Sequence, residues 1–252
     1  MKKAIVKIIN SLGYDIIKRY KSISLDYRYT DFDKEFVQIY NESKPYTMTS
    51  VERLYALYKV VEYVVKNNIE GSFVECGVWR GGSAMMITKT LQMLNVNNRK
   101  IYLYDTFEGM SEPTEKDIDL RNDKASDILK KGDKKSNFYW CYADLTEVKQ
   151  NMMSTGYPMD NIEFVKGKVE ETIPGIIPDK IALLRLDTDW YESSYHEMKY
   201  LYPKLEVNGA LILDDYGYWK GAKEATDRYF SEIKIQPMLN RIDREGRLVI
   251  KR

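Results

Sequence analysis

The 252-residue sequence predicts a doubly wound α/β fold, in which helices cover both faces of a mostly parallel β-sheet. Three observations support this fold class. Short apolar runs, typical of buried strands, alternate with amphipathic stretches of helical period. A glycine-containing turn follows the first apolar run and leads into a helix. Pairs of aspartates end two of the later apolar runs.

The composition indicates one folded domain with an added arm. Hydrophobic residues make up 44% of the chain, and its length suits a single large domain. The formal net charge of +1 gives no indication of a nucleic-acid partner. Two cysteines do not make a disulfide framework, so we expect a cytoplasmic protein. The sequence shows no secretory signal and no apolar run long enough to cross a membrane.

Residues 1–46 are expected to form a helical N-terminal arm, ahead of an α/β domain in residues 47–252. Within residues 1–21, isoleucines recur near helical spacing among six basic side chains and one acidic side chain. This pattern fits a basic amphipathic helix on the inner face of a membrane, or a helix packed on a second subunit. Residues 22–45 show no clear period, which predicts a linker with short helical pieces.

The α/β domain should open with a helix that ends near Asn67. A capping box predicts its start, with Thr49 as the cap and Glu52 reaching back. The first strand is then predicted at Phe73–Cys76.

A glycine turn, bracketed by Gly77 and Gly81, joins this strand to a helix whose apolar face begins at Ala84. Such a turn can cradle a cofactor, because glycines admit the ligand to the backbone and the helix N-terminus offers free N–H groups. The spacing differs from the dinucleotide motif G-x-G-x-x-G, so a ligand with an amino-acid part and a nucleoside part fits better than one with a pyrophosphate.

The second predicted strand, 100–105, ends in Asp105, an acid placed to bond both ribose hydroxyls of a nucleoside. An N-cap for the following segment is the alternative role. Polar, irregular sequence then predicts an insertion over about residues 109–145 that could act as a lid. Its lysine run is better interpreted as a solvated face than as a nucleic-acid patch. Residues 162–166 form the third predicted strand.

Carboxylates gather where two further strands end. The fourth strand, 181–186, is followed by Asp187 and Asp189, and the fifth, 210–213, by Asp214 and Asp215. Because like charges at one edge repel, and a cation usually relieves that repulsion, the pattern predicts a divalent-metal site at the carboxyl edge of the sheet.

The helices of the C-terminal part are predicted at residues 192–205 and 220–233. An antiparallel hairpin of residues 233–238 and 247–250 should close the sheet.

Several motifs carry a resemblance to a known family: Thr47-Met-Thr-Ser, Phe73-Val-Glu-Cys-Gly-Val-Trp-Arg-Gly-Gly, Tyr104-Asp-Thr-Phe-Glu-Gly, Leu184-Arg-Leu-Asp-Thr-Asp-Trp-Tyr-Glu-Ser-Ser, Leu201-Tyr-Pro-Lys-Leu and Leu213-Asp-Asp-Tyr. From about residue 47 to 230 the sequence resembles the TylF/MycF-type (macrocin O-methyltransferase) family of S-adenosylmethionine- and magnesium-dependent enzymes, which act on sugar hydroxyls. The resemblance implies a Rossmann-like class I methyltransferase with a seven-stranded sheet, usually oligomeric, that takes a small-molecule or glycan sugar acceptor.

The resemblance also assigns roles to individual residues. Positions that match the family's cofactor site are Met48, Thr49, Glu75, Gly77, Gly81, Ser83, Asp105 and Thr106. Asp187, Asp214 and Asp215 match the magnesium ligands, and Asp189 matches the proposed general base. Orienting metal-bound water is the alternative role for Asp189. The turn at Gly167 lacks the family's aromatic residue, and residues 110–145 do not match closely, so the acceptor cannot be carried over.

Three rival functions explain less of the sequence. Asp187-Thr-Asp189 is also the D-x-D pattern of metal-dependent glycosyltransferases, but that function leaves Gly77 and Asp105 unexplained. A D-x-D phosphatase would need a small hydroxyl residue where Tyr191 stands. A non-catalytic S-adenosylmethionine-binding scaffold would have no use for the intact set of carboxylates.

Overall fold

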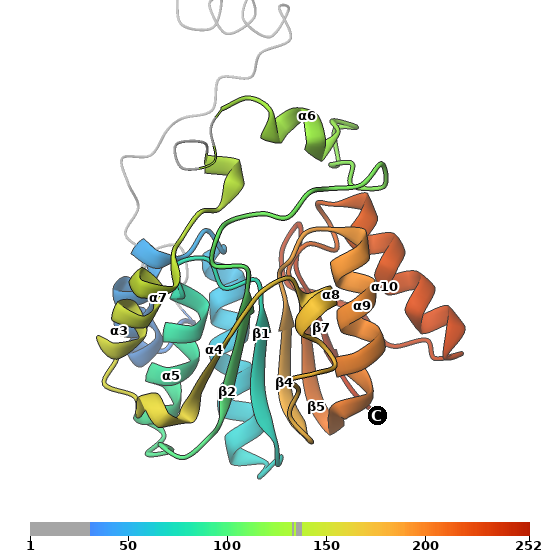
Figure 1. The fold of residues 1–252 in the computed structure, drawn as a ribbon. Helices are drawn as coiled ribbons and strands as arrows, with labels where there is room; N and C mark the ends of the chain where they lie inside the picture. The colour runs from blue at the N-terminus through green and yellow to red at the C-terminus, as the bar shows by residue number, and fades with distance from the viewer. Residues whose placement is uncertain (1–30, 133, 135–137) are drawn as a thin grey trace, which may run out of the picture. The chain divides into compact units, whose positions relative to one another are not determined.

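The computed structural model describes residues 31–132, 134 and 138–252 (Figure 1). The chain divides into two units, Met1–Val37 and Gln38–Arg252, and the sheet and the candidate site belong to the second. The predicted amphipathic helix of residues 1–21 lies outside the described residues. Among the helices that the structure describes, none is both long and apolar enough to span a membrane.

The second unit is built on a seven-stranded sheet of strand order β3-β2-β1-β4-β5-β7-β6. The strands are β1 (Ser72–Cys76), β2 (Ile101–Asp105), β3 (Ile162–Lys166), β4 (Ile181–Leu186), β5 (Leu205–Leu213), β6 (Asn240–Arg241) and β7 (Arg247–Ile250). The first five strands in the chain pair in parallel, and β7 runs antiparallel to both β5 and β6. The predicted Rossmann-like sheet with an antiparallel C-terminal hairpin is therefore confirmed.

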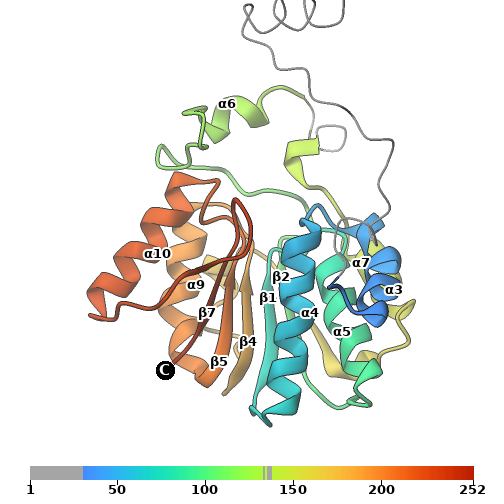
Figure 2. The ribbon, with the colours of Figure 1, turned by 180° about the vertical axis from the view of Figure 1, so that it is seen from behind.

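Helices connect the parallel strands and cover both faces of the sheet. The α-helices are α3 (Lys34–Ser43), α4 (Val51–Lys66), α5 (Gly82–Met93), α6 (Ala125–Leu129), α7 (Leu145–Met153), α8 (Val169–Thr172), α9 (Tyr191–Leu201) and α10 (Lys220–Glu232). Figure 2 shows α4 in front of the sheet, whereas α9 lies on the opposite face, toward the viewer in Figure 1. In both views α6 lies beyond one end of the sheet.

The two faces of the central strands differ in what they bury. Alternate residues of β1 and β4, such as Val74 and Leu184, join a large apolar cluster with α9 and α10. The residues between them face the α4 side, and two of these are charged: Glu75 and Arg185 are both 1% exposed. Because a buried charge is costly unless it is paired, this side of the sheet holds something other than a plain core.

Two boundary predictions were wrong at the start of the domain and at its end. Ser50, not Thr49, caps α4: its hydroxyl accepts a hydrogen bond from the N–H of Arg53 at 3.1 Å. The Thr49 hydroxyl is used elsewhere, as shown below. The first strand of the closing hairpin is Asn240–Arg241, not residues 233–238. The alternating apolar residues there (Ile233, Ile235 and Met238) are exposed, so their pattern did not report a buried strand face.

The helix before β5 also ends earlier than predicted. Proline at position 203 cannot continue an α-helix, so α9 stops at Leu201 and a 3₁₀ turn, Tyr202–Lys204, follows it. The strand β5 then starts at Leu205, five residues before the predicted position.

Candidate active site

A cavity of about 320 Å³ opens where β1, β2, β4 and β5 end, a volume within the range of small-molecule pockets. The predicted site residues that line it are Met48, Thr49, Gly77, Ser83, Asp105, Thr106, Asp187, Asp189, Asp214 and Asp215. Glu75 and Gly81 do not line the cavity. Residues distant in sequence thus meet at one place, as expected for the carboxyl edge of a parallel sheet.

The two glycines of the first turn are required for different structural reasons. Gly77 has a φ of +82°, and a Cβ at this position would overlap the carbonyl oxygen of Asp187. A glycine is therefore required for the end of β1 to lie this close to the end of β4. Gly81 precedes α5 with a φ of +90° and lies next to Val148 and Met152 of α7, away from the cavity.

Asp105 holds the glycine turn against the end of β2. One carboxylate oxygen accepts hydrogen bonds from the N–H groups of Val78 (2.7 Å) and Trp79 (3.0 Å). The other accepts from the N–H of Phe107 at 2.7 Å. Burial raises the pKa of Asp105, and these three N–H groups oppose the rise. The contact between Asp105 and a ribose stays a prediction. The backbone N–H groups already fix the position of the carboxylate that would make this contact.

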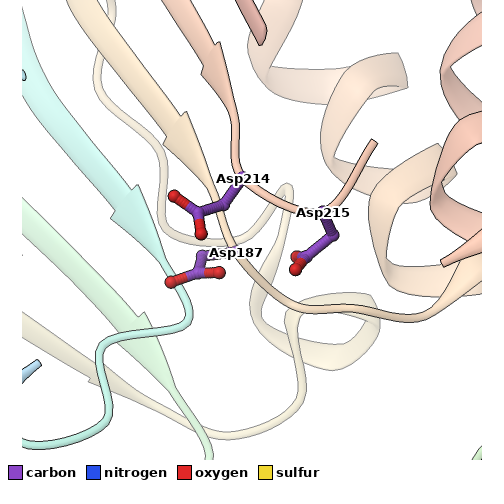
Figure 3. A group of neighbouring side chains, drawn as sticks. All are labelled: Asp187, Asp214 and Asp215. Carbon is purple, nitrogen blue, oxygen red and sulfur yellow. The ribbon is translucent and has the colours of Figure 1, made fainter. Parts of the chain in front are cut away.

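Three aspartates form a compact carboxylate cluster beside this turn. Asp187, Asp214 and Asp215 each offer an oxygen, and these atoms all lie within 4.8 Å of one another (Figure 3). Their strands hold them in place: the N–H of Asp214 donates to the carbonyl of Leu186 at 2.9 Å. Burial raises the pKa of Asp187 well above its ordinary value, and repulsion from Asp214 and Asp215 raises it further.

A buried guanidinium, Arg185, lies beneath the cluster. It contacts Glu75 at 2.7 Å, Asp187 at 2.8 Å and Asp214 at 2.6 Å. Its remaining bond reaches the Thr49 hydroxyl at 2.9 Å. Glu75 and Arg185 face each other directly in the parallel register of β1 and β4, so Glu75 serves the cluster through Arg185.

A second guanidinium comes from α4. Arg53 contacts Asp214, and it also pairs with Asp243 and Glu245 of the C-terminal hairpin loop, each at 3.0 Å. Asp214 is therefore held between two arginines, Arg53 and Arg185. This arrangement fixes the direction in which its carboxylate points.

The charge balance and the donor type suit a hard divalent cation. The carboxylates of the cluster and its neighbours are Glu75, Asp187, Asp189, Asp214 and Asp215. With Asp243 and Glu245, which also pair with Arg53, these acidic groups outnumber the two arginines that face them. The three clustered donors are all carboxylate oxygens, which are the ligands that Mg²⁺ prefers. The cluster thus fits a magnesium ion.

Asp189 lies two residues beyond Asp187 and is held separately. Its φ of +65° is unusual for a residue with a side chain. Its N–H donates to Asp215 at 3.1 Å, and its Oδ1 accepts from the indole N–H of Trp219 at 2.5 Å. Burial, followed by the nearby Asp187, raises the pKa of Asp189 to about 7. A carboxyl group with a pKa near neutrality is suited to proton transfer.

The predicted insertion contributes one wall of the cavity. Met110, Ser111, Tyr139 and Cys141 line it from this segment, and Tyr218 and Trp219 also line the cavity. Part of the segment is docked firmly, because the fully buried Asp117 accepts a hydrogen bond from the N–H of Tyr191 at 2.7 Å. Lid motion stays a prediction for the remainder.

Glu197 is a buried carboxyl group beneath the loop that carries Asp187 and Asp189. The Thr188 hydroxyl donates to its Oε2 at 3.1 Å, while Oε1 has no hydrogen-bond partner among the described residues. Burial raises the pKa of Glu197 well above its ordinary value of 4.5. The folded state therefore binds a proton that the unfolded state releases as the pH rises above about 4.5.

This shift predicts the pH dependence of a Glu197→Gln variant. Because the folded pKa is raised, wild-type stability should fall from about pH 4.5 upward by as much as about 1.4 kcal/mol per pH unit from this group. The amide cannot titrate, so the melting temperature of the variant should exceed that of the wild type by a margin that grows as the pH rises from about 4.5 toward the raised pKa of Glu197, about 2–4 °C per kcal/mol. Thermal unfolding of both proteins across this pH range checks the prediction. A difference in melting temperature that stays constant with pH would show that the pKa of Glu197 is not raised.

Three residues at the site were not singled out from the sequence: Arg53, Arg185 and Trp219. A signal existed for Arg185, because an arginine inside the apolar run of residues 181–186 needs a buried partner. The inward direction of Arg53 and the indole bond of Trp219 left no comparable signal.

The chain is similar over most of its length to known O-methyltransferases. The family model described as Macrocin-O-methyltransferase (TylF) matches residues 4–251. The chain is 32% identical over 201 residues to demethyldecarbamoylnovobiocin O-methyltransferase of Streptomyces niveus, covering 80% of this chain and 74% of that protein. It is 30% identical over 208 residues to 8-demethyl-8-(2,3-dimethoxy-alpha-L-rhamnosyl)-tetracenomycin-C 4'-O-methyltransferase of Streptomyces olivaceus, covering 81% and 75%. The solved structure of the O-methyltransferase NovP matches with a TM-score of 0.70 at 30% identity, covering 82% of each chain.

Proposed function

The chain belongs to the macrocin O-methyltransferase (TylF) family, and from this premise we propose that it transfers the methyl group of S-adenosylmethionine to a sugar hydroxyl with the help of Mg²⁺. One observation carries the proposal. The carboxylate cluster, the separately held Asp189 and the glycine turn share a single cavity. A methyl donor, a metal and an acceptor could therefore meet there.

The cofactor side of the cavity is formed by the turns after β1, β2 and β3, the segment before α4 and the start of α5. Met48, Thr49, Gly77, Ser83 and Thr106 line it and are proposed to contact S-adenosylmethionine. When bound, this cofactor supplies a methyl group on a positively charged sulfur. Asp105 would accept hydrogen bonds from the ribose, and Gly167 would leave the adenine without the aromatic partner usual in the family.

The metal side is formed by the cluster. Asp187, Asp214 and Asp215 would hold the ion, while Arg53 and Arg185 keep Asp214 oriented. When bound, Mg²⁺ lowers the pKa of a coordinated hydroxyl group, whose free pKa lies far above neutrality. Glu75 contributes through its ion pair with Arg185.

Asp189 is proposed to remove the proton of the acceptor hydroxyl while the hydroxyl oxygen forms a bond to the methyl carbon. The carbon–sulfur bond of S-adenosylmethionine breaks at the same time, and S-adenosylhomocysteine is the leaving group. The carboxyl group of Asp189 lines the cavity and lies outside the three-aspartate cluster. General-base assistance of this kind typically contributes about 10²–10⁴-fold to the rate. The enclosing walls position the two reactants, a contribution of roughly 7–11 kcal/mol in well-oriented reactions.

The acceptor is proposed to be a sugar of a glycoside or glycan. The name of the second relative includes a rhamnosyl glycoside, which supports this class. Tyr139, Tyr218 and Met110 line the cavity on the side of the insertion, where the acceptor would enter. Flat aromatic faces suit the apolar faces of a sugar ring.

The proposal also covers the location and assembly of the protein. Two cysteines do not make a disulfide framework, which favours the cytoplasm. Family resemblance favours a homo-oligomer, and the composition of residues 1–21 leaves contact with the inner membrane face or with another subunit open. No nucleic-acid partner is proposed.

Binding and transfer measurements together test the function. Calorimetric titration should show binding of S-adenosylmethionine and no binding of a nucleotide sugar, with or without Mg²⁺. Transfer of labelled methyl to a panel of glycosides should then require Mg²⁺ and stop when EDTA is added. Binding of the nucleotide sugar alone would favour a glycosyltransferase, and transfer unaffected by EDTA would remove the metal from the proposal.

A further inference from the structure

The indole of Trp219 donates its N–H to Asp189 Oδ1 at 2.5 Å. We propose that Trp219 is a positioning residue for methyl transfer, which holds the carboxylate of Asp189 in the orientation that accepts the proton. This inference rests on the proposed role of Asp189 as the base. A short hydrogen bond to a charged oxygen is among the stronger hydrogen bonds in proteins, so it can fix a carboxylate.

The indole is fixed without any help from Asp189. The backbone N–H of Trp219 donates to the carbonyl of Asp215 at 3.0 Å. Its ring meets the ring of Trp190 edge to face, with centroids 5.0 Å apart. It also packs in an apolar cluster with Ala125 and Leu129 of the insertion, and it is only 7% exposed. The donor is therefore a rigid part of the fold.

Asp189, in contrast, has few restraints of its own. It follows the end of β4 in a turn and adopts the left-handed backbone conformation. Its backbone is tied to Asp215, and the bond from Trp219 restrains the rotation of its carboxylate. A displacement of about 1 Å at a reacting group can cost on the order of 100-fold in rate.

The indole also links the base to the insertion. Asp119 forms an isolated antiparallel β-bridge with Trp219, and the N–H of Lys220 donates to the carbonyl of Ile118 at 2.9 Å. Docking of this segment would thus set the position of the indole and, through it, of Asp189. The contacts of Trp219 would therefore connect the insertion, where the acceptor binds, to Asp189, which removes the proton.

A double-mutant cycle tests the inference. Trp219→Phe keeps an aromatic ring but removes the N–H, and should lower kcat on the order of 10- to 100-fold while the affinities for S-adenosylmethionine and Mg²⁺ stay unchanged. In the Asp189→Asn background the same change should lower kcat no further, because the carboxylate it positions is already gone.

Trp190→Phe is the matched control. It removes an indole N–H from the same cluster, here one that donates to the carbonyl of Ser111 at 3.0 Å, and leaves the bond to Asp189 in place. It should lower the melting temperature about as much as Trp219→Phe does and leave kcat near the wild-type value. Equal losses of kcat in both variants would reduce Trp219 to a packing role and overturn the inference.

A spectroscopic readout avoids any change at Trp219. In a ¹⁵N-edited spectrum the four tryptophan indole N–H groups give separate signals, and Asp189→Asn should shift that of Trp219 while the signal of Trp190 stays in place. An unshifted Trp219 signal, wild-type kcat in Trp219→Phe, or an additive loss in the double variant would each overturn the inference. Near-normal turnover of Asp189→Asn would instead show that the proposed base is wrong.

Discussion

Replacing Asp189 with Asn should lower kcat for methyl transfer by about 10²- to 10⁴-fold, the usual contribution of a general base. The side chains have the same shape, and the amide oxygen can still accept the hydrogen bond from Trp219. The ability to take a proton is lost, together with one negative charge near the cluster. The affinity for S-adenosylmethionine should stay at its wild-type value, and Mg²⁺ should still bind because its three clustered ligands remain; titration of each measures this.

Asp105→Asn is the matched comparison for this variant. It makes the same chemical change at the same edge of the sheet, at a carboxylate that contacts the turn after β1. Its main effect should be on S-adenosylmethionine affinity, with turnover at saturation less affected than in Asp189→Asn. A turnover of Asp189→Asn within a few-fold of wild type would assign Asp189 to orienting metal-bound water.

Replacing Asp187 with Ala should abolish magnesium-dependent turnover. The change removes one of three clustered oxygen donors and leaves Arg185 with one fewer carboxylate, so the cavity loses negative charge where the cation would bind. Loss of one ligand and of one charge both weaken the binding of a hard cation. Activity measured against Mg²⁺ concentration should stay at background even at millimolar Mg²⁺.

The chelator response of the Asp187→Ala variant is the check on this assignment. Any residual transfer should be insensitive to EDTA, because no ion would be bound to remove. Residual activity that EDTA still suppresses would mean that the ion binds without Asp187.

Much of the carboxyl edge of the sheet could be predicted from the sequence, because strand ends and the acids that follow them are local features of the chain. Strand 181–186 is a mostly apolar run with sharp ends, and strand 162–166 carries apolar residues between charged ones. The observed bounds of both agree with the prediction. Parallel strands bring their carboxyl ends to one edge, so acids such as Asp187 and Asp214 that follow two strands had to meet. A position at the end of a strand therefore predicted a place in the site.

The partners of these acids could not be predicted in the same way. Arg53 reaches Asp214 from a helix far away in the sequence, and its other partners, Asp243 and Glu245, lie in a loop near the C-terminus. No periodic pattern reports which polar side chain of a helix points inward. Neutralisation of the cluster by arginines thus became visible only with the tertiary structure.

Local patterns also failed where tertiary packing decided the outcome. Thr49 and Ser50 are both good helix caps, and the choice between them follows from Thr49 being needed by Arg185. Asp117 looked like one more polar residue of the insertion, yet it is fully buried and bonds the first turn of α9.

Titration of Mg²⁺ into the wild-type protein, loaded with S-adenosylhomocysteine, tests the central claim that the carboxylate cluster is a metal site. Calorimetry should show one binding event that is lost in Asp187→Ala. It should be retained in Glu170→Gln, whose carboxylate lines the same cavity outside the cluster and bonds Ser193 at 2.7 Å. Absence of binding to the wild type, or equal binding to the wild type and Asp187→Ala, would contradict the account.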